Sequence, residues 1–381
     1  MAKKFVVPSK IIFGENAANE LVPLIEDLAV KKVLLVYDGG VKAAGIADVI
    51  IGELKKTSVN IAIFDRVLPN PSDQLVDEAT ELAKKEKVEA IIAVGGGSAI
   101  DLAKAVNILL TNPAPIHLYE GPDKVKNKTK TLIAIPTTAG TSSEITNVIA
   151  LIDTKKVRKM VIVGKNVGAD YAIVDPKFTL TMPKSVTAAT GMDAMTHAIE
   201  SYVSVNASEL TEYNALKGLK ILYDNIKKVV EDGNDIKARE QMLLGCLITG
   251  FSFNNADLGL VHGIAHTLSA HFNLPHGMAN AAVLPYVMEY NAEVVPEKMV
   301  DLAKALGIET TGNIEEDKLL AAKAMIKLGK EIGIKPLEEQ GVKKSSFGQL
   351  AEDVLVEPVL NFNPRKNVTK EDILGILEKA F

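Results

Sequence analysis

Two kinds of hydrophobic pattern divide this 381-residue chain and constrain its fold. Up to residue 176, short apolar runs alternate with helical stripes. The run at 32–37, KVLLVY, is continuous, as expected for a parallel strand covered on both faces. This alternation predicts a parallel sheet with helices on both sides, whereas from residue 185 onward only helical stripes remain.

We therefore expect an α/β domain over residues 1–180 and an all-helical domain over 181–381, because a chain of this length exceeds what one core usually supports. In the first domain, residues 5–7 and 11–13 are expected to form a hairpin or an edge strand. The other expected strands are 32–37, 59–64, 88–94, 131–135, 146–152, 159–163 and 171–174, and the expected helices are 16–28, 41–56, 73–86 and 98–110. The helices expected in the second domain are 185–204, 208–230, 236–255, 259–272, 277–292, 296–305, 315–332, 345–353 and 370–380, the last capped by Thr369 with Asp372.

Composition excludes several classes of function. The formal net charge of −5 offers no basic surface for nucleic acid or for an anionic membrane. No apolar stretch is long enough to span a bilayer, and the N-terminus lacks the apolar run of a signal peptide. The single cysteine, Cys246, excludes an intrachain disulfide framework and fits a reducing compartment. We expect a cytoplasmic protein.

Histidines mark the candidate reactive site. Four of the six lie in residues 259–277, GLVHGIAHTLSAHFNLPHG, and a fifth, His197, follows Asp193 by four residues. Residues four apart share one helix face, so Asp193 pairs with His197 and His262 pairs with His266. His276, between a proline and a glycine, is expected where the chain leaves the helix. A carboxylate and two or three imidazoles converging from two helices predict a transition-metal site for Fe²⁺, Zn²⁺, Mn²⁺ or Co²⁺.

The alternative is that each histidine is an ordinary buried, hydrogen-bonded residue. In that case every imidazole on these mostly apolar helices would need its own polar partner, which makes the joint pattern harder to explain. His271, off the shared face, and the distant His117 are expected to be structural.

A glycine-rich turn marks a candidate nucleotide site. Gly95-Gly96-Gly97-Ser98 ends an expected strand and begins an expected helix. Glycines allow close approach of the backbone to an anion, and a helix N-terminus directs N–H groups at it, as a pyrophosphate requires. The motif is not G-x-G-x-x-G, so a plain tight turn, with Asp101 capping Ser98, is the alternative.

Two further segments favour a dinucleotide. Asp38 ends the first buried strand, where a carboxylate accepts from the ribose hydroxyls and repels a 2′-phosphate, favouring NAD over NADP. The loop at 136–143, PTTAGTSS, offers hydroxyls and N–H groups to a phosphate or ribose. A simple turn at Asp38 and an ordinary Ser/Thr-rich loop are the alternatives.

Together these residues resemble the iron-containing (group III) alcohol dehydrogenase family along nearly the whole chain. The matching segments are Leu68-Pro-Asn-Pro71, Gly95-Gly-Gly-Ser-Ala-Ile-Asp101, Pro136-Thr-Thr-Ala-Gly-Thr141, Glu144, Gly191-Met-Asp-Ala-Met-Thr-His-Ala-Ile-Glu200, Gly259-Leu-Val-His-Gly-Ile-Ala-His266, Pro275-His-Gly-Met-Ala-Asn280 and Asn363-Pro-Arg365. The lactaldehyde reductase, propanediol and butanol dehydrogenase branch is the most similar, within a dehydroquinate synthase-like fold.

The resemblance implies a site. Its implied metal ligands are Asp193, His197, His262 and His276, and His266 would lie between the metal and the nicotinamide. Its implied NAD contacts are Asp38, Asn70, Gly96, Gly97, Ser98, Thr137, Thr138 and Lys159. Ser269 stands where the family often has glycine, which bears on local helix packing. Val148 stands about where lactaldehyde reductases carry asparagine, which favours a simple primary alcohol as substrate.

The implied reaction is hydride transfer between NAD(H) and a short primary alcohol, diol or its aldehyde. The metal polarises the substrate oxygen, and nicotinamide and metal must converge. His266 is the candidate for relaying the proton, and Phe253 either walls an apolar pocket or belongs to the core. Iron rests on the resemblance, and zinc binds such ligands more tightly. The resemblance also suggests a homodimer paired through the N-terminal strand over residues 4–13.

Three other functions are weighed. One is a zinc enzyme similar to glycerol dehydrogenase. Another is an NAD-dependent lyase of the dehydroquinate synthase type, which needs a cationic pocket, although no Lys or Arg lies between Arg239 and His276. The third is a non-enzymatic protein that binds a metal and a nucleotide.

Overall fold

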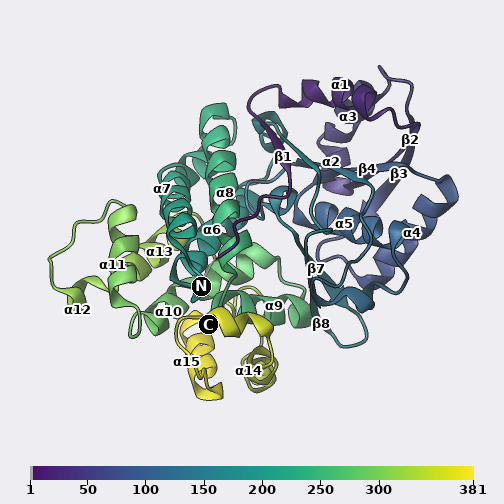
Figure 1. Ribbon diagram of the computed structural model, residues 1–381. Coiled ribbons are helices and arrows are strands. Elements are labelled where there is room, and N and C mark those ends of the chain that lie inside the picture. The colour runs from purple at the N-terminus through teal and green to yellow at the C-terminus, as the bar shows by residue number, and fades with distance from the viewer. Residues whose placement is uncertain (1–2) are drawn as a thin grey trace. The chain divides into compact units, whose positions relative to one another are not determined.

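The computed structural model describes residues 3–381 and contains two compact units (Figure 1). The sheet unit comprises residues 7–182. The helical unit comprises residues 183–381 together with the N-terminal residues up to Val6. The division in the chain thus falls after Met182, and a short N-terminal segment joins the second unit.

A six-stranded sheet with strand order β1-β9-β6-β4-β2-β3 forms the centre of the sheet unit, and every neighbouring pair is parallel. Its central strands are continuous apolar runs, and β4 is buried along its whole length. A parallel sheet needs cover on both faces, which such runs supply. The strands are β1 (Lys10–Phe13), β2 (Lys32–Asp38), β3 (Asn60–Val67), β4 (Ala90–Gly95), β6 (Thr131–Pro136) and β9 (Tyr171–Val174).

Helices cover the two faces of this sheet with separate hydrophobic cores. One core joins the sheet to α4 (Asp73–Glu86) and α5 (Gly97–Thr111). The other joins it to α1 (Leu21–Leu28) and α3 (Ile46–Leu54). Figure 1 shows α1 and α3 on one side of the strands and α4 and α5 on the other. The remaining short elements of this unit are η1 (Ala17–Glu20), α2 (Gly39–Ala43), η2 (Ile116–Tyr119), η3 (Ser143–Ile145) and η4 (Pro176–Thr179).

A smaller three-stranded sheet lies beside α5. Its order is β5-β8-β7, with β5 (Gly121–Pro122) parallel to β8 (Arg158–Val163) and β7 (Val148–Asp153) antiparallel to β8. The Asp101 side chain of α5 accepts a hydrogen bond from the backbone N–H of Ala150 at 2.9 Å. This bond fixes β7 against the helix.

Ten helices make up most of the helical unit in the described residues. α7 packs against α6 and α8, and α10 packs against α6 and α9. The helices are α6 (Lys184–Val203), α7 (Glu209–Glu231), α8 (Ile236–Ala256), α9 (Leu260–Phe272), α10 (His276–Asn291), α11 (Pro296–Ala305), α12 (Ile314–Asp317), α13 (Leu320–Glu331), α14 (Phe347–Leu355) and α15 (Lys370–Ala380), with short turns η5 (Lys344–Ser346) and η6 (Pro358–Phe362). None of them is both long and apolar enough to cross a bilayer.

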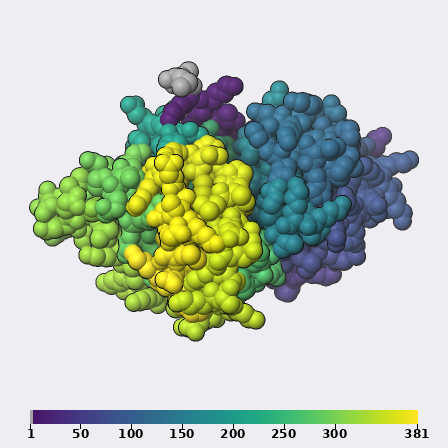
Figure 2. Space-filling model, turned by 90° about the horizontal axis from the view of Figure 1, so that it is seen from below, coloured from purple at the N-terminus to yellow at the C-terminus, as the bar shows by residue number. Residues whose placement is uncertain are grey.

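The C-terminal helices bury one face each. α14 buries Phe347, Leu350 and Val354, and the opposite faces of α14 and α15 lie at the surface, shown in yellow in Figure 2. The predicted cap of α15 is confirmed, because Thr369 and Asp372 form a reciprocal capping box.

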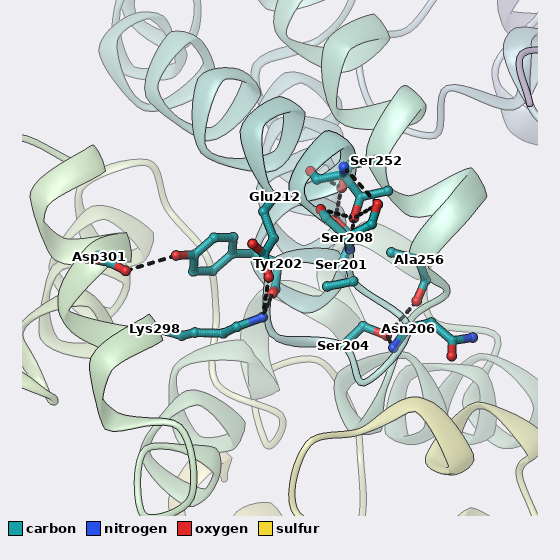
Figure 3. A network of polar contacts seen from close by, with 12 residues as sticks. Ser201, Tyr202, Ser204, Asn206, Ser208, Glu212, Ser252, Ala256, Lys298 and Asp301 are labelled. Carbon is teal, nitrogen blue, oxygen red and sulfur yellow. Dashed lines mark hydrogen bonds and ion pairs between the residues drawn. The ribbon is translucent and has the colours of Figure 1, made fainter. Parts of the chain in front are cut away.

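A polar network fixes the C-terminal end of α6, the central helix of this unit (Figure 3). The Tyr202 hydroxyl donates to Asp301 at 3.0 Å, and the Lys298 ammonium donates to the Tyr202 carbonyl at 2.6 Å and to Glu212 at 2.8 Å. On the other side, the Ser252 hydroxyl donates to Ser201 at 2.7 Å. The network ties α6 to α7, α8 and α11, which restricts its rotation.

Two helix predictions were wrong, and one strand prediction held in part. Of the two alternatives for the N-terminus, the edge strand is confirmed at β1, which lies at the edge of the sheet and pairs with β9, whereas no hairpin forms and residues 3–8 are not a strand. The backbone of Val6 is instead bound by the side chains of Asn254 and Asn255. The helix expected at 41–56 breaks at Gly45, whose φ of 74° is left-handed. The helix expected at 315–332 is divided into α12 and α13.

Candidate active site

Helix α6 supplies three acidic or imidazole side chains along one buried face. Asp193, His197 and Glu200 are exposed by only 2%, 4% and 3%. Their spacing of four and three residues places them on successive turns. Small and apolar neighbours bury this helix over most of its circumference, so these polar groups are withdrawn from bulk water.

Close backbone packing brings α10 onto α6. A Cβ atom at Gly277 would lie 2.3 Å from the carbonyl oxygen of Ala189, so only glycine permits this approach. The preceding residue, His276, is the first residue of α10 rather than the end of α9. The candidate metal ligands therefore come from three helices and not from two, which corrects the sequence prediction.

The four predicted ligands lie together. One donor atom each of Asp193, His262 and His276 lies within 4.8 Å of the others. The Asp193 Oδ1 atom lies 3.8 Å from the Nε2 atoms of both His197 and His276. The rings of His197 and His262 are stacked with centroids 4.9 Å apart. One carboxylate and three imidazoles form a donor set that suits a divalent transition metal.

A shared contact shows that these donors face one another. The side-chain amide of Asn280, fully buried on α10, donates to Asp193 Oδ1 at 2.6 Å. The same nitrogen lies 3.3 Å from His262 Nε2 and 3.2 Å from His276 Nε2. Three predicted ligand atoms thus converge on one point, and the residues present fit a bound metal ion.

Glu200 orients His262 from behind. One carboxylate oxygen lies 2.5 Å from His262 Nδ1, and the other accepts from the backbone N–H of Val261 at 2.7 Å. A carboxylate at Nδ1 fixes the proton there and leaves Nε2 as a lone-pair donor, as in carboxylate–histidine–metal triads. The sequence prediction missed this role. Glu200 follows Asp193 by seven residues, which is two helical turns, so it could have been predicted to lie on the same face of the helix as the ligands.

Phe253 and His266 complete the surroundings. Phe253, buried on α8, stacks on His197 with ring centroids 4.2 Å apart and therefore holds that imidazole in place. His266 lies beside the cluster, its ring 5.5 Å from that of His276, and its Nδ1 is 3.2 Å from Glu357 Oε2. Glu357 lies 91 residues further along the chain, and no local pattern predicts it.

The two other histidines lie elsewhere. His271 pairs with Asp353 at 2.7 Å near the surface of the helical unit. His117, in the sheet unit, lies 3.0 Å from Asp73. Ser269 is buried within an uninterrupted α9, so this departure from the family pattern does not break the helix.

In the sheet unit, six of the eight predicted nucleotide contacts lie at or just after the carboxyl ends of β2, β4 and β6. These strands are adjacent, and Gly95 of β4 is paired with Pro136 of β6. The two helices after β2, α2 and α3, cover one face, whereas the helix after β4, α5, covers the other. Such a reversal opens a crevice at the ends of the strands where α/β proteins bind ligands.

The glycine turn is packed against the loop after β6. A Cβ atom at Gly96 would lie 3.2 Å from Thr138, and one at Gly97 would lie 2.9 Å from Thr141. The first turn of α5 leaves backbone N–H groups without helical partners at this point, the usual anion site of such folds. Ser98 lies within that turn, and Thr137 donates its backbone N–H to Gly95.

Two carboxylates near this turn have defined partners. Asp38 caps α2 by accepting from the backbone N–H of Val41 at 2.9 Å, so one of its oxygens takes part in a turn. Asp101 does not cap Ser98, and that alternative is wrong. It accepts from Ala150, and from the Ser143 hydroxyl, and the N-cap of α5 is Gly96.

Asn70 and Lys159 are both close to one residue of β7. The N–H of Ile152 donates to the carbonyl of Pro71 at 2.9 Å, and Ile152 is paired with Lys159 across the β7–β8 ladder. Asn70 directly precedes Pro71 and has a left-handed φ of 51°. Two predicted NAD contacts far apart in the sequence are thereby brought into one neighbourhood.

A buried acid and a buried base also lie in this unit, and the sequence prediction assigned no role to either. Burial raises the pKa of Glu144 to about 7, although its own backbone N–H and Lys104 oppose the shift. Burial also lowers the pKa of Lys104. The Lys104 ammonium donates to Ser143 at 3.0 Å and to the carbonyl of Val148 at 2.8 Å, which ties the loop after β6 to β7.

Known families match both parts of the chain. The iron-containing alcohol dehydrogenase model matches residues 8–176, and the C-terminal model of the Fe-containing alcohol dehydrogenase family matches residues 187–381. The 1,3-propanediol dehydrogenase of Citrobacter freundii is 38% identical, over 99% of this chain and 98% of its own. Lactaldehyde reductase of Escherichia coli K12 is 35% identical over 100% of both chains.

A solved structure of a relative is similar to this chain in fold as well. Sulfoacetaldehyde reductase from Bifidobacterium kashiwanohense, in complex with NAD⁺, has a TM-score of 0.89 at 28% identity, covering 100% of this chain and 99% of its own. The chain is an alcohol–aldehyde oxidoreductase, and use of a metal ion and NAD is typical of its relatives. By sequence along its whole length and by fold, it belongs to the iron-containing alcohol dehydrogenase family.

Proposed function

We propose that this chain transfers a hydride between NAD(H) and a short primary alcohol or diol, or the corresponding aldehyde. The names of its relatives support this substrate class, since they act on 1,3-propanediol and lactaldehyde. Val148, at the start of β7, stands about where the resemblance places a polar asparagine in lactaldehyde reductases. This apolar side chain favours a simple primary alcohol over a hydroxylated aldehyde.

Asp193, His197, His262 and His276 are the proposed metal ligands. The observation that carries this assignment is the convergence of the donor atoms of Asp193, His262 and His276, with Glu200 beside His262. His197 joins them through its Nε2 atom, which lies 3.8 Å from Asp193 Oδ1. When bound, a divalent metal there would act as a Lewis acid toward the substrate oxygen. Iron is typical of the family, but the Irving–Williams order favours zinc at equilibrium, so metal supply in the cell decides between them.

The protein's own residues prepare this site. Glu200 holds the His262 proton on Nδ1, Phe253 supports the ring of His197, and Asn280 orients the Asp193 carboxylate. His266, held by Glu357, is the proposed proton relay because it lies beside the cluster, with its ring 5.5 Å from that of His276, and the family resemblance does not count it among the ligands. An imidazole in such a position can move a proton to and from the substrate hydroxyl.

NAD is proposed to bind at the carboxyl ends of β2, β4 and β6. Gly96, Gly97 and Ser98 would receive the pyrophosphate, and Thr137 and Thr138 lie on the facing loop. Asp38 keeps a carboxylate beside the glycine turn, which would disfavour the 2′-phosphate of NADP. The proposed remaining contacts are Asn70 and Lys159.

We further propose a homodimer formed through the N-terminal segment. Phe5, Val6 and Val7 are each about 40% exposed, an apolar run with no strand partner of its own in the described residues. The single cysteine supports function in the reducing cytoplasm.

Two measurements test the proposed function together. Metal analysis of anaerobically purified protein should give one ion per chain from these four ligands, and NADH absorbance should report turnover of short primary alcohols and aldehydes. The replacements His262→Ala and His276→Ala should each remove the ion held by these four ligands and abolish turnover. Full metal content and turnover in either variant would refute the ligand set, and turnover of glycerol alone with zinc would favour the glycerol dehydrogenase alternative.

A further inference from the structure

A second group of metal-ligating side chains lies in the sheet unit and has no part in the function proposed above. Asp73 is the first residue of α4, His117 belongs to η2, and Asp153 ends β7. One donor atom from each lies within 4.8 Å of the other two. Three elements distant in the sequence thus bring two carboxylates and one imidazole to one point.

The distances within this group are compatible with ligands around one metal ion. His117 Nε2 lies 3.0 Å from Asp73 Oδ2 and 3.7 Å from Asp153 Oδ1. Even so, the buried Nε2 atom makes no hydrogen bond with any described residue, and neither does Asp153 Oδ2. Two ligands bound at about 2.0–2.1 Å to a tetrahedral zinc ion lie about 3.3 Å apart, which falls between the two observed separations.

Both carboxylates are fixed in place by other bonds. Asp73 Oδ1 accepts from the Thr154 hydroxyl at 2.8 Å, and Asp153 Oδ1 accepts from the backbone N–H groups of Lys155 and Lys156 at 3.0 Å each. The carboxylates are therefore oriented ligands rather than mobile surface acids.

Two buried carboxylates this close repel one another unless a positive charge lies between them, either a bound ion or a charged His117 imidazole. Asp73 is 4% exposed and Asp153 is 1% exposed, so water screens their repulsion poorly. Lys156 is the one nearby ammonium, 3.9 Å from Asp153 Oδ2 and equally far from Glu120, on a side chain that is 59% exposed. An ion pair at this distance on an exposed lysine offsets little of the repulsion between the two carboxylates. Arg158 is already paired with Glu120.

We propose that Asp73, His117 and Asp153 form a second metal site, for a divalent transition ion of the Zn²⁺ class. An N₁O₂ donor set with one open position suits zinc, cobalt and manganese. The His117 side chain is 29% exposed, which gives an ion a path from solvent.

The proposed ion would join two parts of the sheet unit. Asp73 follows the loop that contains Asn70, and Asp153 lies at the turn between β7 and β8. The bond from Ile152 to Pro71 already connects the two segments, and Lys159 is paired with Ile152. A metal bound next to this bond would stiffen the neighbourhood of Asn70 and Lys159.

The test counts metal equivalents and does not depend on catalysis. In the full-length variant His262→Ala/His276→Ala, the only remaining candidate site in the described residues is the proposed one. Titration with Zn²⁺ by calorimetry, and with Co²⁺ by visible absorbance, should give one equivalent. The further replacement His117→Ala should weaken binding at least about tenfold, as expected on loss of one ligand of three. The same change at His271 should leave binding intact.

Two additional results separate metal binding from an ion pair. Lys156→Ala removes the competing ammonium, so Zn²⁺ affinity should stay the same or rise. The wild-type chain, fully loaded, should carry one ion more than the folded His117→Gln variant, as measured by elemental analysis with circular dichroism as a check of folding. No Zn²⁺ equivalent in the double variant, or equal metal content in wild type and His117→Gln, would overturn the proposal and leave an ion pair only.

Discussion

Glu200 shows how one buried residue can govern a neighbouring ligand. We expect Glu200→Gln to lower metal affinity by about 10–100-fold, because the amide no longer holds the His262 proton on Nδ1 with a full charge. Competition with a chelator measures the affinity. Glu357→Gln is the matched control, since Glu357 contacts His266 rather than a proposed ligand. An unchanged affinity in Glu200→Gln would remove Glu200 from the site.

His266 is expected to act on the rate and not on the metal. His266→Ala should keep the metal content of the wild type while kcat falls by roughly 10²–10⁴-fold, the usual contribution of a positioned proton-transfer group. Elemental analysis and steady-state NADH kinetics measured on the same preparation separate the two effects. If the variant loses its metal, the relay assignment is wrong.

Glu144 makes the stability of the fold depend on pH. Its folded pKa of about 7 lies above the ordinary value of 4.5, so the folded state retains the proton more strongly than the unfolded chain does. The free energy of unfolding should therefore fall as pH rises from about 4.5 to about 7, by roughly 3 kcal/mol at most. Urea titrations of Glu144→Gln should show a flatter profile over this window, whereas Glu81→Gln, exposed on α4, should follow the wild type.

The sequence predicted the polar groups that a helix repeat makes visible and missed those that only tertiary packing brings in. Asp193 with His197 and His262 with His266 share helix faces, so their proximity follows from spacing alone. Glu357 reaches His266 from the segment between α14 and η6, and nothing local in that segment indicates this. Asn280 lies four residues after His276 on α10, a spacing that could have indicated its contact with the cluster. His276 was expected at a helix end because a proline precedes it, yet a proline also commonly precedes a new helix.

At the scale of elements, the start of α5 packs so closely against the loop after β6 that Gly96 and Gly97 leave no ordinary space for a Cβ atom. We expect Gly97→Ala to push its Cβ against Thr141, displacing the loop after β6 and weakening NADH binding, with about 1–3 kcal/mol lost to overpacking. Fluorescence titration with NADH and urea unfolding measure the two effects. Gly52→Ala on α3 meets nothing within 4 Å, so it should leave binding unchanged and add about 0.5–1 kcal/mol of stability.

The sequence predicted which segments are strands and helices better than it predicted which strands pair and where helices break. Continuous apolar runs such as β2 and β4 can be recognised because burial on both faces leaves no polar alternation. The pairing of β1 with β9 could not be predicted, since no nearby segment carries information about a partner some 160 residues away. The break at Gly45 was overlooked because the apolar stripe continues across it.

For the whole molecule, association is expected to depend on the N-terminal segment. Phe5→Asp should convert the proposed dimer to a monomer, because a charge would have to be buried in an apolar contact. Light scattering coupled to size-exclusion chromatography reports the mass. Val356→Asp, at an apolar position that is 75% exposed, introduces the same charge and should leave the mass unchanged. A dimer that persists in Phe5→Asp would place the interface elsewhere.

The pairing of β1 with β9 also sets an order of events during synthesis. The first strand leaves the ribosome well before its partner at residues 171–174 exists, and Val6 must wait longer still, for Asn254 and Asn255. β9 lies between β1 and β6 in the sheet, so neither strand has this neighbour until some 174 residues have been made. Contacts this distant slow folding, so the unpaired first strand is expected to stay exposed to aggregation while the chain is being made.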